Sequence, residues 1–548
     1  MTDSLLVWVL LAPLLGAVVA LFGKLLAPLK RPLSFLGAAT LAVPAAALAL
    51  LLEPVLSGES VRYALGGWPE PYGIALVLDG LSWISCALTT VIAVAVALFS
   101  LGRRRYGAGY FFFLLMMVSG MYGVALTGDL FTMFVSFEVV AVAAYVLIAW
   151  EGTATGLAAS YKYLVLSTTG ILFFLFGVFL VYRDLGVLSI SLISEALAAS
   201  GGVLNTPAMH LALASLCVGI GVRTAFIPFH TWLPEAHAYA PHPVSAVLSG
   251  AMIKVSLFAM IRIVLQFGGD YLLELLMWIG AVTALVAVIS ALSQSDVKRL
   301  LAYHSISQLG YMLAVFGAGS ALALTASFSH ALNHALFKSL LFLTVGAAVS
   351  LTGQRNLYRI PPLGRRLPAF SAAFFAGALS ISGIPPFNGF ASKGLITAGM
   401  KGSPAYPLLW VTSFLTIASF IKLGRIFLPG EDRDGVTAGG ENPGALQTAV
   451  VVALGVLCLG TGVFGQSIAR GLYRILHGAA PASIPSLFSG GKLLGVLPAA
   501  ALGAAAYLAV STDLGKRLSG RVRELAPELR TVLLFFFVGL LAFAAVAY

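Results

Sequence analysis

Charged residues and cysteines are both scarce in this sequence. Only 10% of the 548 residues are charged, whereas 59% are hydrophobic and the mean hydropathy is +0.98. That composition lies outside the range of soluble globular proteins. Each of the three cysteines, Cys86, Cys217 and Cys458, falls inside an apolar run and none has a metal-ligand spacing. A disulfide framework and an iron–sulfur site are therefore excluded, and we expect one polytopic membrane domain.

Nucleotide-binding motifs are also missing. The sequence has no phosphate-binding loop and no dinucleotide-binding glycine fingerprint, so we expect no cofactor and no catalytic residue in this chain. Any redox chemistry would belong to partner subunits. The net charge of +11 does not indicate a nucleic-acid partner, because the basic residues form short clusters between apolar runs, as membrane topology requires.

Apolar runs of about 18 to 25 residues recur along the whole chain, and each is long enough to cross roughly 30 Å of hydrocarbon. The first run follows Asp3 and precedes basic residues, which is the opposite polarity to a cleaved signal peptide. We therefore predict an all-α polytopic membrane protein whose first fourteen helices lie near residues 4–23, 33–52, 74–101, 108–127, 130–150, 158–182, 208–229, 243–267, 272–294, 299–317, 320–350, 369–400, 404–428 and 446–466. Two further helices are predicted at 491–511 and 530–548, on either side of a charged amphipathic segment at 514–530.

The loop charges predict the topology. Lysine and arginine should gather on every second connection, the cytoplasmic one. With the predicted helices, one side receives the basic clusters at 30–31, 103–105, 298–299, 355–366 and 517–530, and the other side receives the acidic loop with Glu53, Glu59, Glu70 and Asp79. Both termini are then expected outside the cytoplasm, in a plasma-membrane protein. Arg470 and Arg474 are the exception, since they are predicted on the outer side.

Two predicted helices are interrupted by proline at matching places. The interruptions are FIPFHTWLP at 226–234, in the seventh helix, and GIPPFNG at 383–389, in the twelfth. A spacing of five helices inverts the second copy in the membrane, and broken helices in corresponding positions indicate a transport site. The basic residues near the breaks follow the same order in both copies: Arg223 and then Lys254, Lys393 and then Lys422.

These features predict the domain organisation. We expect N-terminal membrane helices over 1–127, a first inverted repeat over 108–267, a second over 272–428, and C-terminal helices over 446–548. The alternative is that the two breaks are coincidental, because proline and glycine are common in membrane helices.

Several ionisable residues fall inside apolar helices, where each charge costs at least about 2.5 to 3.5 kcal/mol on insertion scales. Glu138 lies mid-helix without a basic residue nearby in sequence, so its partner must come from another helix. His330, His334 and Lys338 are spaced by four residues and share one helix face. Imidazole titrates near neutrality, and a lysine removed from water loses its proton more easily, so this row can pass protons. Lys254 and Lys393 would extend the series.

Structural roles are the alternative for these residues. Buried charges can form static pairs, and lysines can extend to a nearby interface; this interpretation applies most to Arg223 and Lys422, close to helix ends. His304 is interpreted as a polar packing contact. His230, His237 and His242 surround the first break, but we expect no metal there. Histidines in a hydrated loop are the commoner outcome, with His230 and His237 as a possible proton entrance.

Four motifs resemble one known family. They are GVRTAFIPFHTWLPEAH at 221–237 with PVSA at 243–246 and Lys254, DVKRLLAYHSISQLG at 296–310, HALFKSLL at 334–341, and GFASKG at 389–394. Together they resemble the antiporter-like subunits of respiratory complex I, of Mrp-type sodium/proton antiporters and of membrane-bound hydrogenases. The resemblance covers roughly residues 70–430.

This resemblance implies a fourteen-helix core of two inverted five-helix repeats, with helices 7 and 12 broken and a hydrated polar axis parallel to the membrane. By the same match, Glu138 is the fifth-helix glutamate, Lys254 the bridging lysine, His334 and Lys338 the central relay, and Lys393 the twelfth-helix exit lysine. The last two helices fall outside this core.

Position 223 departs from the family pattern. The family usually has lysine there, whereas this chain has Arg223, which is effectively never deprotonated. Arg223 can then act only as a fixed charge or a moving counter-ion, and Glu138 would have to titrate alone.

The resulting hypothesis is translocation of protons or sodium ions, together with other membrane subunits that include further antiporter-like ones. The driving reaction is then either redox chemistry or a counter-ion gradient, in a complex I, Mrp or hydrogenase type of assembly. Two rivals remain, a non-conducting structural membrane subunit and a stand-alone cation/proton antiporter.

Overall fold

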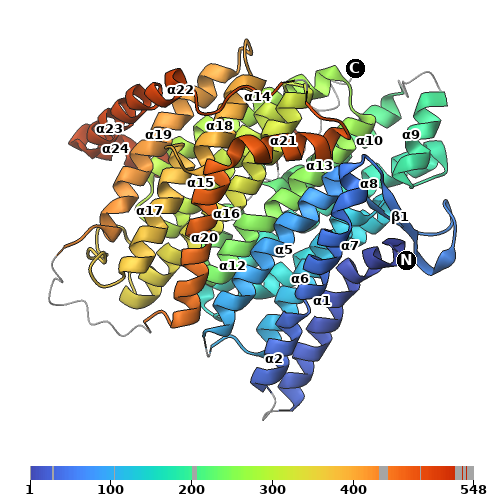
Figure 1. The fold of residues 1–548 in the computed structure, drawn as a ribbon, viewed down its shortest axis with the longest axis horizontal. Coiled ribbons are helices and arrows are strands. Elements are labelled where there is room, and N and C mark those ends of the chain that lie inside the picture. The colour runs from blue at the N-terminus through green and yellow to red at the C-terminus, as the bar shows by residue number, and fades with distance from the viewer. Residues whose placement is uncertain are drawn as a thin grey trace.

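The computed structural model is a bundle of membrane helices with one short β-hairpin (Figure 1). It describes residues 2–26, 30–103, 105–199, 206–430, 442–481 and 483–524, and beyond these only Leu534, Val538 and Gly539. Within the described part, 13 helices are long and apolar enough to cross a membrane. The chain is therefore a multi-pass, helical membrane protein, as its composition predicts.

The N-terminal part packs two membrane helices beside a hairpin. Its elements are α1 (Thr2–Leu25), α2 (Lys30–Ala39), α3 (Ala42–Leu50), α4 (Leu52–Leu56), β1 (Val61–Ala64), the 3₁₀ helix η2 (Leu65–Gly67) and β2 (Ala75–Leu78). The second predicted span, 33–52, corresponds to α2 and α3, which a turn at residues 40–41 separates.

A short hairpin in this otherwise helical protein corrects the predicted start of the third span. β1 and β2 pair antiparallel, with Val61 opposite Leu78. All four residues of β2 are buried, so their apolar side chains resemble the start of a membrane helix in the sequence. The predicted span 74–101 therefore begins only at Gly80, where the Asp79 carboxylate caps α5 by accepting from the Ser82 N–H at 2.8 Å.

The next helices lead to the first break. They are α5 (Gly80–Leu101), α6 (Ala108–Leu126), α7 (Leu130–Ile148), α8 (Ala154–Leu185), α9 (Ile190–Ala199) and α10 (Pro207–Thr224). α10 ends where Ala225 adopts a left-handed conformation, with φ 60°. After the break the chain continues as α11 (Leu233–Tyr239), α12 (His242–Val247), the π-helical turn η3 (Leu248–Met252) and α13 (Ile253–Phe267).

The break frees backbone N–H and C=O groups, and side chains form hydrogen bonds with them, as an environment without water requires. The Trp232 indole N–H donates to the Val222 carbonyl at 2.8 Å, and the Ile227 N–H donates to the Thr283 hydroxyl at 3.1 Å. The predicted helix 208–229 therefore stops five residues early without leaving these groups unpaired.

The second half contains the other predicted break. Its elements are α14 (Asp270–Ser293), α15 (Val297–Phe316), α16 (Ala321–Thr352), α17 (Pro368–Ser382), α18 (Asn388–Gly399), α19 (Tyr406–Gly424) and the 3₁₀ turn η4 (Arg425–Phe427). The predicted span 369–400 is thus two helices. α17 ends at Gly383, whose φ of 74° is the left-handed conformation that glycine adopts readily.

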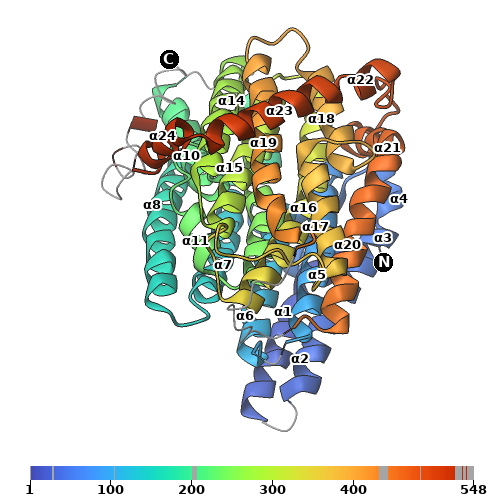
Figure 2. The same cartoon turned by 90° about the vertical axis from the view of Figure 1, so that its left-hand side faces the viewer.

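The C-terminal part departs from a plain bundle. It contains α20 (Ala445–Val463), the amphipathic α21 (Gly465–His477), α22 (Gly490–Leu494), α23 (Val496–Ser511) and α24 (Asp513–Glu524). Residues 490–511 meet the length and hydropathy expected of a span, but only 6% of that window is buried. Figure 2 shows α23 running across α19 rather than alongside it. Most of the predicted helix 530–548, and residues 525–530 of the amphipathic segment, lie outside the described residues.

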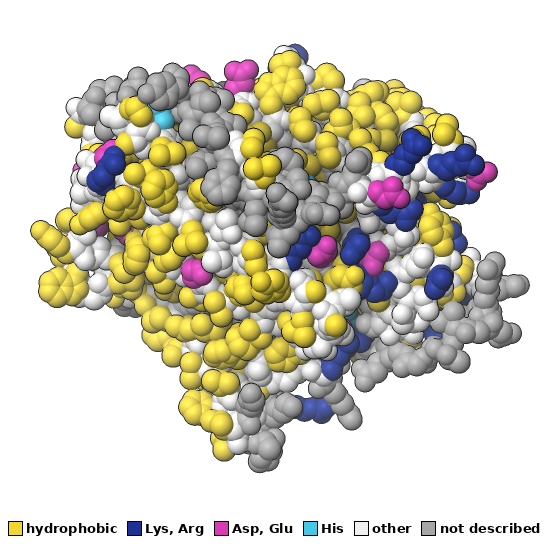
Figure 3. Space-filling view, turned by 180° about the vertical axis from the view of Figure 1, so that it is seen from behind, with side chains coloured by type: hydrophobic (Ala, Val, Ile, Leu, Met, Phe, Trp, Pro, Cys, Tyr) yellow, Lys and Arg dark blue, Asp and Glu magenta, His cyan; other side chains and the backbone are white. Residues whose placement is uncertain are grey.

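Arg474, the predicted exception to the charge pattern, lies on the same side of the bundle as the acidic loop. The Arg474 guanidinium donates to the Leu56 carbonyl at 3.1 Å, which places it on the side of the acidic loop, as predicted. On the back of the molecule, hydrophobic side chains cover the left and centre, and lysine and arginine gather toward the right (Figure 3).

Candidate functional site

An ion pair joins α7 and α10 before the first break. Arg223 Nη2 lies 2.7 Å from Glu138 Oε1, and Arg223 Nη1 donates to the Phe137 carbonyl at 3.0 Å. The arginine side chain is 3% exposed, whereas that of Glu138 is 34% exposed. Glu138 thus has the cross-helix partner that its sequence context requires, and its carboxylate reaches the outside of the bundle.

Lys254 lies in the first turn of α13, directly after the π-helical turn η3. Its side chain is fully buried, and its ammonium donates to the Ser249 carbonyl within that turn. The Ser249 hydroxyl bonds the Ser305 hydroxyl of α15 at 2.7 Å. A π-turn widens the helix and frees carbonyl groups, so η3 supplies the acceptor that a buried ammonium needs.

The predicted row on α16 is present and buried. His330, His334 and Lys338 are each 0% exposed, and the rings of the two histidines are 6.3 Å apart. The Lys338 ammonium donates to the Leu301 carbonyl of α15. His334 is close enough to Lys254, Lys338 and His330 to interact with each electrostatically, so it lies at the centre of the cluster.

The far end of the row approaches the second break. His330 Nδ1 bonds the Ser392 hydroxyl of α18 at 3.0 Å, and His330 Nε2 bonds the Gln308 amide oxygen at 3.0 Å. The next residue of α18 is Lys393, whose buried ammonium lies 5.5 Å from the centre of the Tyr311 ring. No described residue accepts a hydrogen bond from it.

Tyr163 of α8 lies between the ion pair and Met252, in the π-helical turn that precedes Lys254. It is 1% exposed and close enough to Arg223 and Glu138 to interact with both electrostatically. Its hydroxyl lies 3.9 Å from the sulfur of Met252, two residues before Lys254. Sequence reasoning missed Tyr163 and Gln308, because a lone polar side chain in an apolar helix has no periodic signal.

The histidines around the first break are not brought together. His237 is fully buried, with its ring stacked on Phe342 at 4.9 Å. His242 stands edge-on to Phe99. His230 instead lines a cavity of about 120 Å³ with Lys162 and Glu235. In the part of the chain that the structure describes, no three His, Cys, Asp or Glu side chains are grouped to hold a metal ion.

Two residues with suggested structural roles have firm hydrogen-bond partners. The Lys422 ammonium donates to the carbonyls of Leu292 at 2.8 Å and Gln294 at 2.7 Å, at the C-terminal end of α14. These carbonyls have no partner within their own helix, so Lys422 caps the end of α14. His304 bonds the Ser419 hydroxyl at 2.7 Å and packs against Phe420.

The profile of the membrane family "NADH:quinone oxidoreductase/Mrp antiporter" matches residues 127–421, which include the ion pair, the buried lysines and both breaks. The chain belongs to this family. Among its relatives, a subunit of the NADH-quinone oxidoreductase of Desulforudis audaxviator is 34% identical over 88% of this chain and all of its own length. A Na(+)/H(+) antiporter subunit of Bacillus subtilis is 29% identical over 78% of this chain and 87% of its own.

Solved structures of the family superpose well on this fold. A chain of the Mrp complex from a Dietzia species matches with a TM-score of 0.78 and 26% identity, covering 90% of this chain and 99% of its own. A chain of a membrane-bound sulfane sulfur reductase, an archaeal respiratory complex, matches with a TM-score of 0.77, 26% identity and coverage of 91% and 99%. The family resemblance of the motifs is thereby confirmed.

Proposed function

We propose that this chain moves protons through the membrane part of a multisubunit complex, as its antiporter-like subunit. The observation that carries the proposal is the burial of the side chains of Lys254 and Lys338 and of the ammonium group of Lys393, none of which has an acidic partner among the described residues. A permanent charge at such positions costs several kcal/mol. Each lysine is therefore expected to lose its proton easily and to take it back when a neighbour's charge changes.

In the first step, a change in the charge of Glu138 alters the protonation of Lys254. Arg223 stays charged and holds the glutamate by a contact of 2.7 Å. When Glu138 takes up a proton, the nearby Arg223 becomes an uncompensated cation, which favours deprotonation of Lys254. The position of Tyr163 between the pair and Met252 supports a coupling through this side chain.

The second step runs along α16. His334 lies among Lys254, Lys338 and His330, and an imidazole can accept a proton on one nitrogen and release it from the other. Neither ring nitrogen of His334 has a hydrogen-bond partner among the described residues, so both are free for transfer. His330 would then pass the proton through Ser392 toward Lys393 as the exit.

An entrance near the first break completes the path. His230 lines a polar cavity with Lys162, which pairs with Glu235 at 3.1 Å. His237 lies deeper and is close enough to Lys338 and Lys254 to interact with them electrostatically. We propose that protons enter at His230 and reach the lysines past His237.

The proposed domain organisation places this ion path within two inverted repeats. It comprises N-terminal helices over 1–127, inverted repeats over 108–267 and 272–428 built around the broken helices 7 and 12, and further helices over 446–548. The repeats are supported by the left-handed residue that ends the first half of each broken helix, Ala225 and Gly383. We place the chain in the plasma membrane with both termini outside the cytoplasm. The 34% exposure of Glu138 gives a neighbouring subunit direct access to the carboxylate.

The transported ion is proposed to be H+ rather than Na+. Sodium needs several oxygen ligands, and Glu138, hydroxyls and freed carbonyls are the available ones. At the centre of the path, however, the ammonium groups of Lys254 and Lys338 already occupy the carbonyls of Ser249 and Leu301. Their positive charge would also repel a metal cation.

Removal of both central lysines tests the proposal against a purely structural role. The double variant Lys254→Ala and Lys338→Ala should abolish ion translocation by the intact complex while the complex still assembles. Unchanged pumping would support the non-conducting subunit. Exchange of ions by the purified chain alone, reconstituted in vesicles, would instead support the stand-alone antiporter.

A further inference from the structure

A cavity of about 760 Å³ lies where four helix ends meet, and no residue of the proposed ion path lines it. It is bounded by the beginnings of α2, α6 and α20 and by the end of α5. Next to the cavity, the Gln447 amide of α20 donates to the Phe99 carbonyl of α5 at 3.4 Å and so joins two of these helices. All of its lining residues lie outside the segment 127–421 that matches the family.

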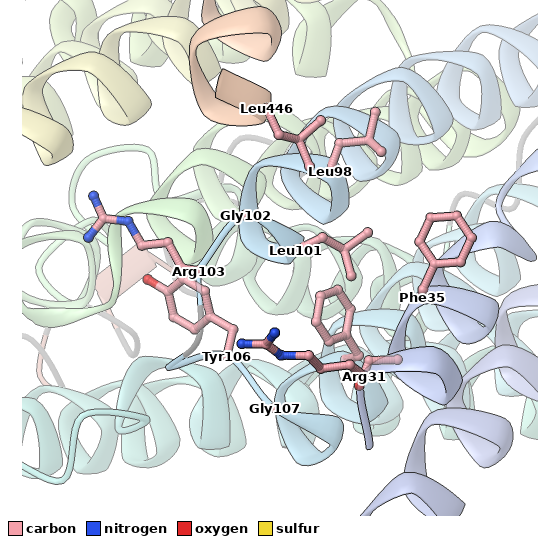
Figure 4. Close-up of a pocket in the computed structure, with 11 residues that line it drawn as sticks. Arg31, Phe35, Leu98, Leu101, Gly102, Arg103, Tyr106, Gly107 and Leu446 are labelled. Carbon is pink, nitrogen blue, oxygen red and sulfur yellow. The ribbon is translucent and has the colours of Figure 1, made fainter. Parts of the chain in front are cut away.

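The lining of the cavity has separate cationic and apolar parts. Figure 4 shows the guanidinium of Arg31 turned toward Tyr106, and the guanidinium of Arg103 on the far side of Tyr106, pointing away from Arg31. Leu98 and Leu446 lie side by side away from the arginine head groups, and Phe35 stands over the stem of Arg31. None of the eleven residues drawn there is acidic. One end of the cavity is therefore cationic, and the other is a hydrocarbon surface.

The cavity also lies at the right depth for a lipid headgroup. The basic clusters at 30–31 and 103–105 mark the polar ends of the neighbouring spans, and tyrosine is typical of that interface. The mouth opens outward, since Phe35 is 61% and Leu446 40% exposed. A molecule that fits must bring an anion to Arg31 and an apolar chain to Leu98.

We propose that this cavity binds one anionic phospholipid, with the phosphate on Arg31 and an acyl chain along Leu98 and Phe35. Arginine suits this role because its planar guanidinium can donate two parallel hydrogen bonds to phosphate oxygens. Basic pockets between membrane helices on the cytoplasmic side recognise such headgroups. The bound lipid would join the N-terminal helix α2 to α20, which begins at the other end of the chain. This inference does not depend on the proposed ion path.

Native mass spectrometry of the delipidated complex tests the site, with dioleoyl phosphatidylglycerol and dioleoyl phosphatidylcholine as probes. We expect at least one phosphatidylglycerol to bind more tightly than phosphatidylcholine. Arg31→Gln should weaken that binding about fivefold, the effect of one cationic side chain near a lipid headgroup. Arg359→Gln, which removes an exposed arginine outside the cavity, is the matched control and should bind as the wild type does.

A second variant separates a lipid from a free anion. Leu98→Trp fills the apolar end and leaves Arg31 in place, so it should reduce the binding of both phospholipids. The proposal is overturned if Arg31→Gln binds phosphatidylglycerol as Arg359→Gln does. It is also overturned if Leu98→Trp changes nothing, or if inorganic phosphate displaces the signal as well as the lipid does.

Discussion

Arg223 holds Glu138 from inside the bundle, through a contact of 2.7 Å between Nη2 and Oε1 and a second bond of 3.0 Å to the peptide oxygen of Phe137. The two partners differ in environment, because the arginine side chain is 3% exposed and the glutamate 34%. The cation is therefore fixed in the interior, and the carboxylate is the member of the pair that a neighbouring subunit can contact.

The charge of Arg223, rather than its shape, is predicted to matter for transport. Arg223→Lys keeps a cation beside Glu138, so ion translocation should stay within about threefold of the wild type, a change of less than about 1 kcal/mol. Arg223→Gln leaves the carboxylate without its counter-ion and should lower translocation at least about tenfold. Both rates are measured in sealed vesicles. Equal losses in the two variants would contradict a role as a fixed charge.

Replacing a buried lysine that serves transport should lower the translocation rate, whereas replacing one that serves stability should lower the unfolding midpoint. Lys338→Met removes an unpaired buried charge, so the thermal unfolding midpoint should stay equal or rise while translocation is lost. The Leu301 carbonyl still accepts from the Ser305 hydroxyl at 3.2 Å. Midpoints are compared in detergent and rates in vesicles.

Lys422→Met is the matched control for this pair of measurements. It leaves the carbonyls of Leu292 and Gln294 without a donor, which should cost about 1 to 3 kcal/mol of stability. Translocation should be largely kept. Our assignment would be reversed if Lys422→Met were more stable than the wild type but no longer conducted, and Lys338→Met were less stable but still conducted.

The hydroxyl of Tyr163 is predicted to link the ion pair with Lys254. Tyr163→Phe preserves the ring that stacks on Trp232 at 4.3 Å and removes only the polar atom, so assembly should be normal and translocation severalfold slower. Tyr122→Phe is the control, because Tyr122 is equally buried but bonds Thr90 at 2.6 Å and has no part in the path. Identical rates in the two variants would remove Tyr163 from the account.

Hydropathy and charge spacing predict most of this fold, because a helical chain that spans lipid must bond its backbone groups within long apolar helices. Every predicted span up to residue 511 has a helix or a helix pair in the structure. The hairpin was missed, since the apolar run of β2 cannot be told from a helix start by periodicity. α21 was also missed, because an amphipathic helix has no continuous apolar run.

The candidate site was predictable where residues share one helix. The row on α16 follows directly from a spacing of four. Contacts between helices have no such pattern, so neither the bond between Gln308 and His330 nor the position of Tyr163 could be found from the sequence. For Glu138, the sequence required a partner from another helix, and packing identifies it as Arg223.

The second break depends on a close approach between its two helices. A Cβ at Gly389 would lie 1.7 Å from the Ser380 carbonyl oxygen, so Gly389→Ala must push α18 away from α17. We expect a loss of about 1 to 3 kcal/mol in stability, together with slower translocation as Lys393 is displaced. Gly394→Ala is the control, since its nearest neighbour is a Leu487 methyl at 3.5 Å and alanine favours a helix. Equal unfolding midpoints for both variants would contradict this packing argument.

The most direct test of the ion path is the translocation rate of the whole complex in sealed vesicles, for wild type and Glu138→Gln at the same rate of the driving reaction. The carboxamide keeps the size of the side chain and cannot take up a proton. Our account predicts that the complex assembles and that translocation is lost, because the charge change that starts the path no longer occurs. Translocation at the wild-type rate would contradict it.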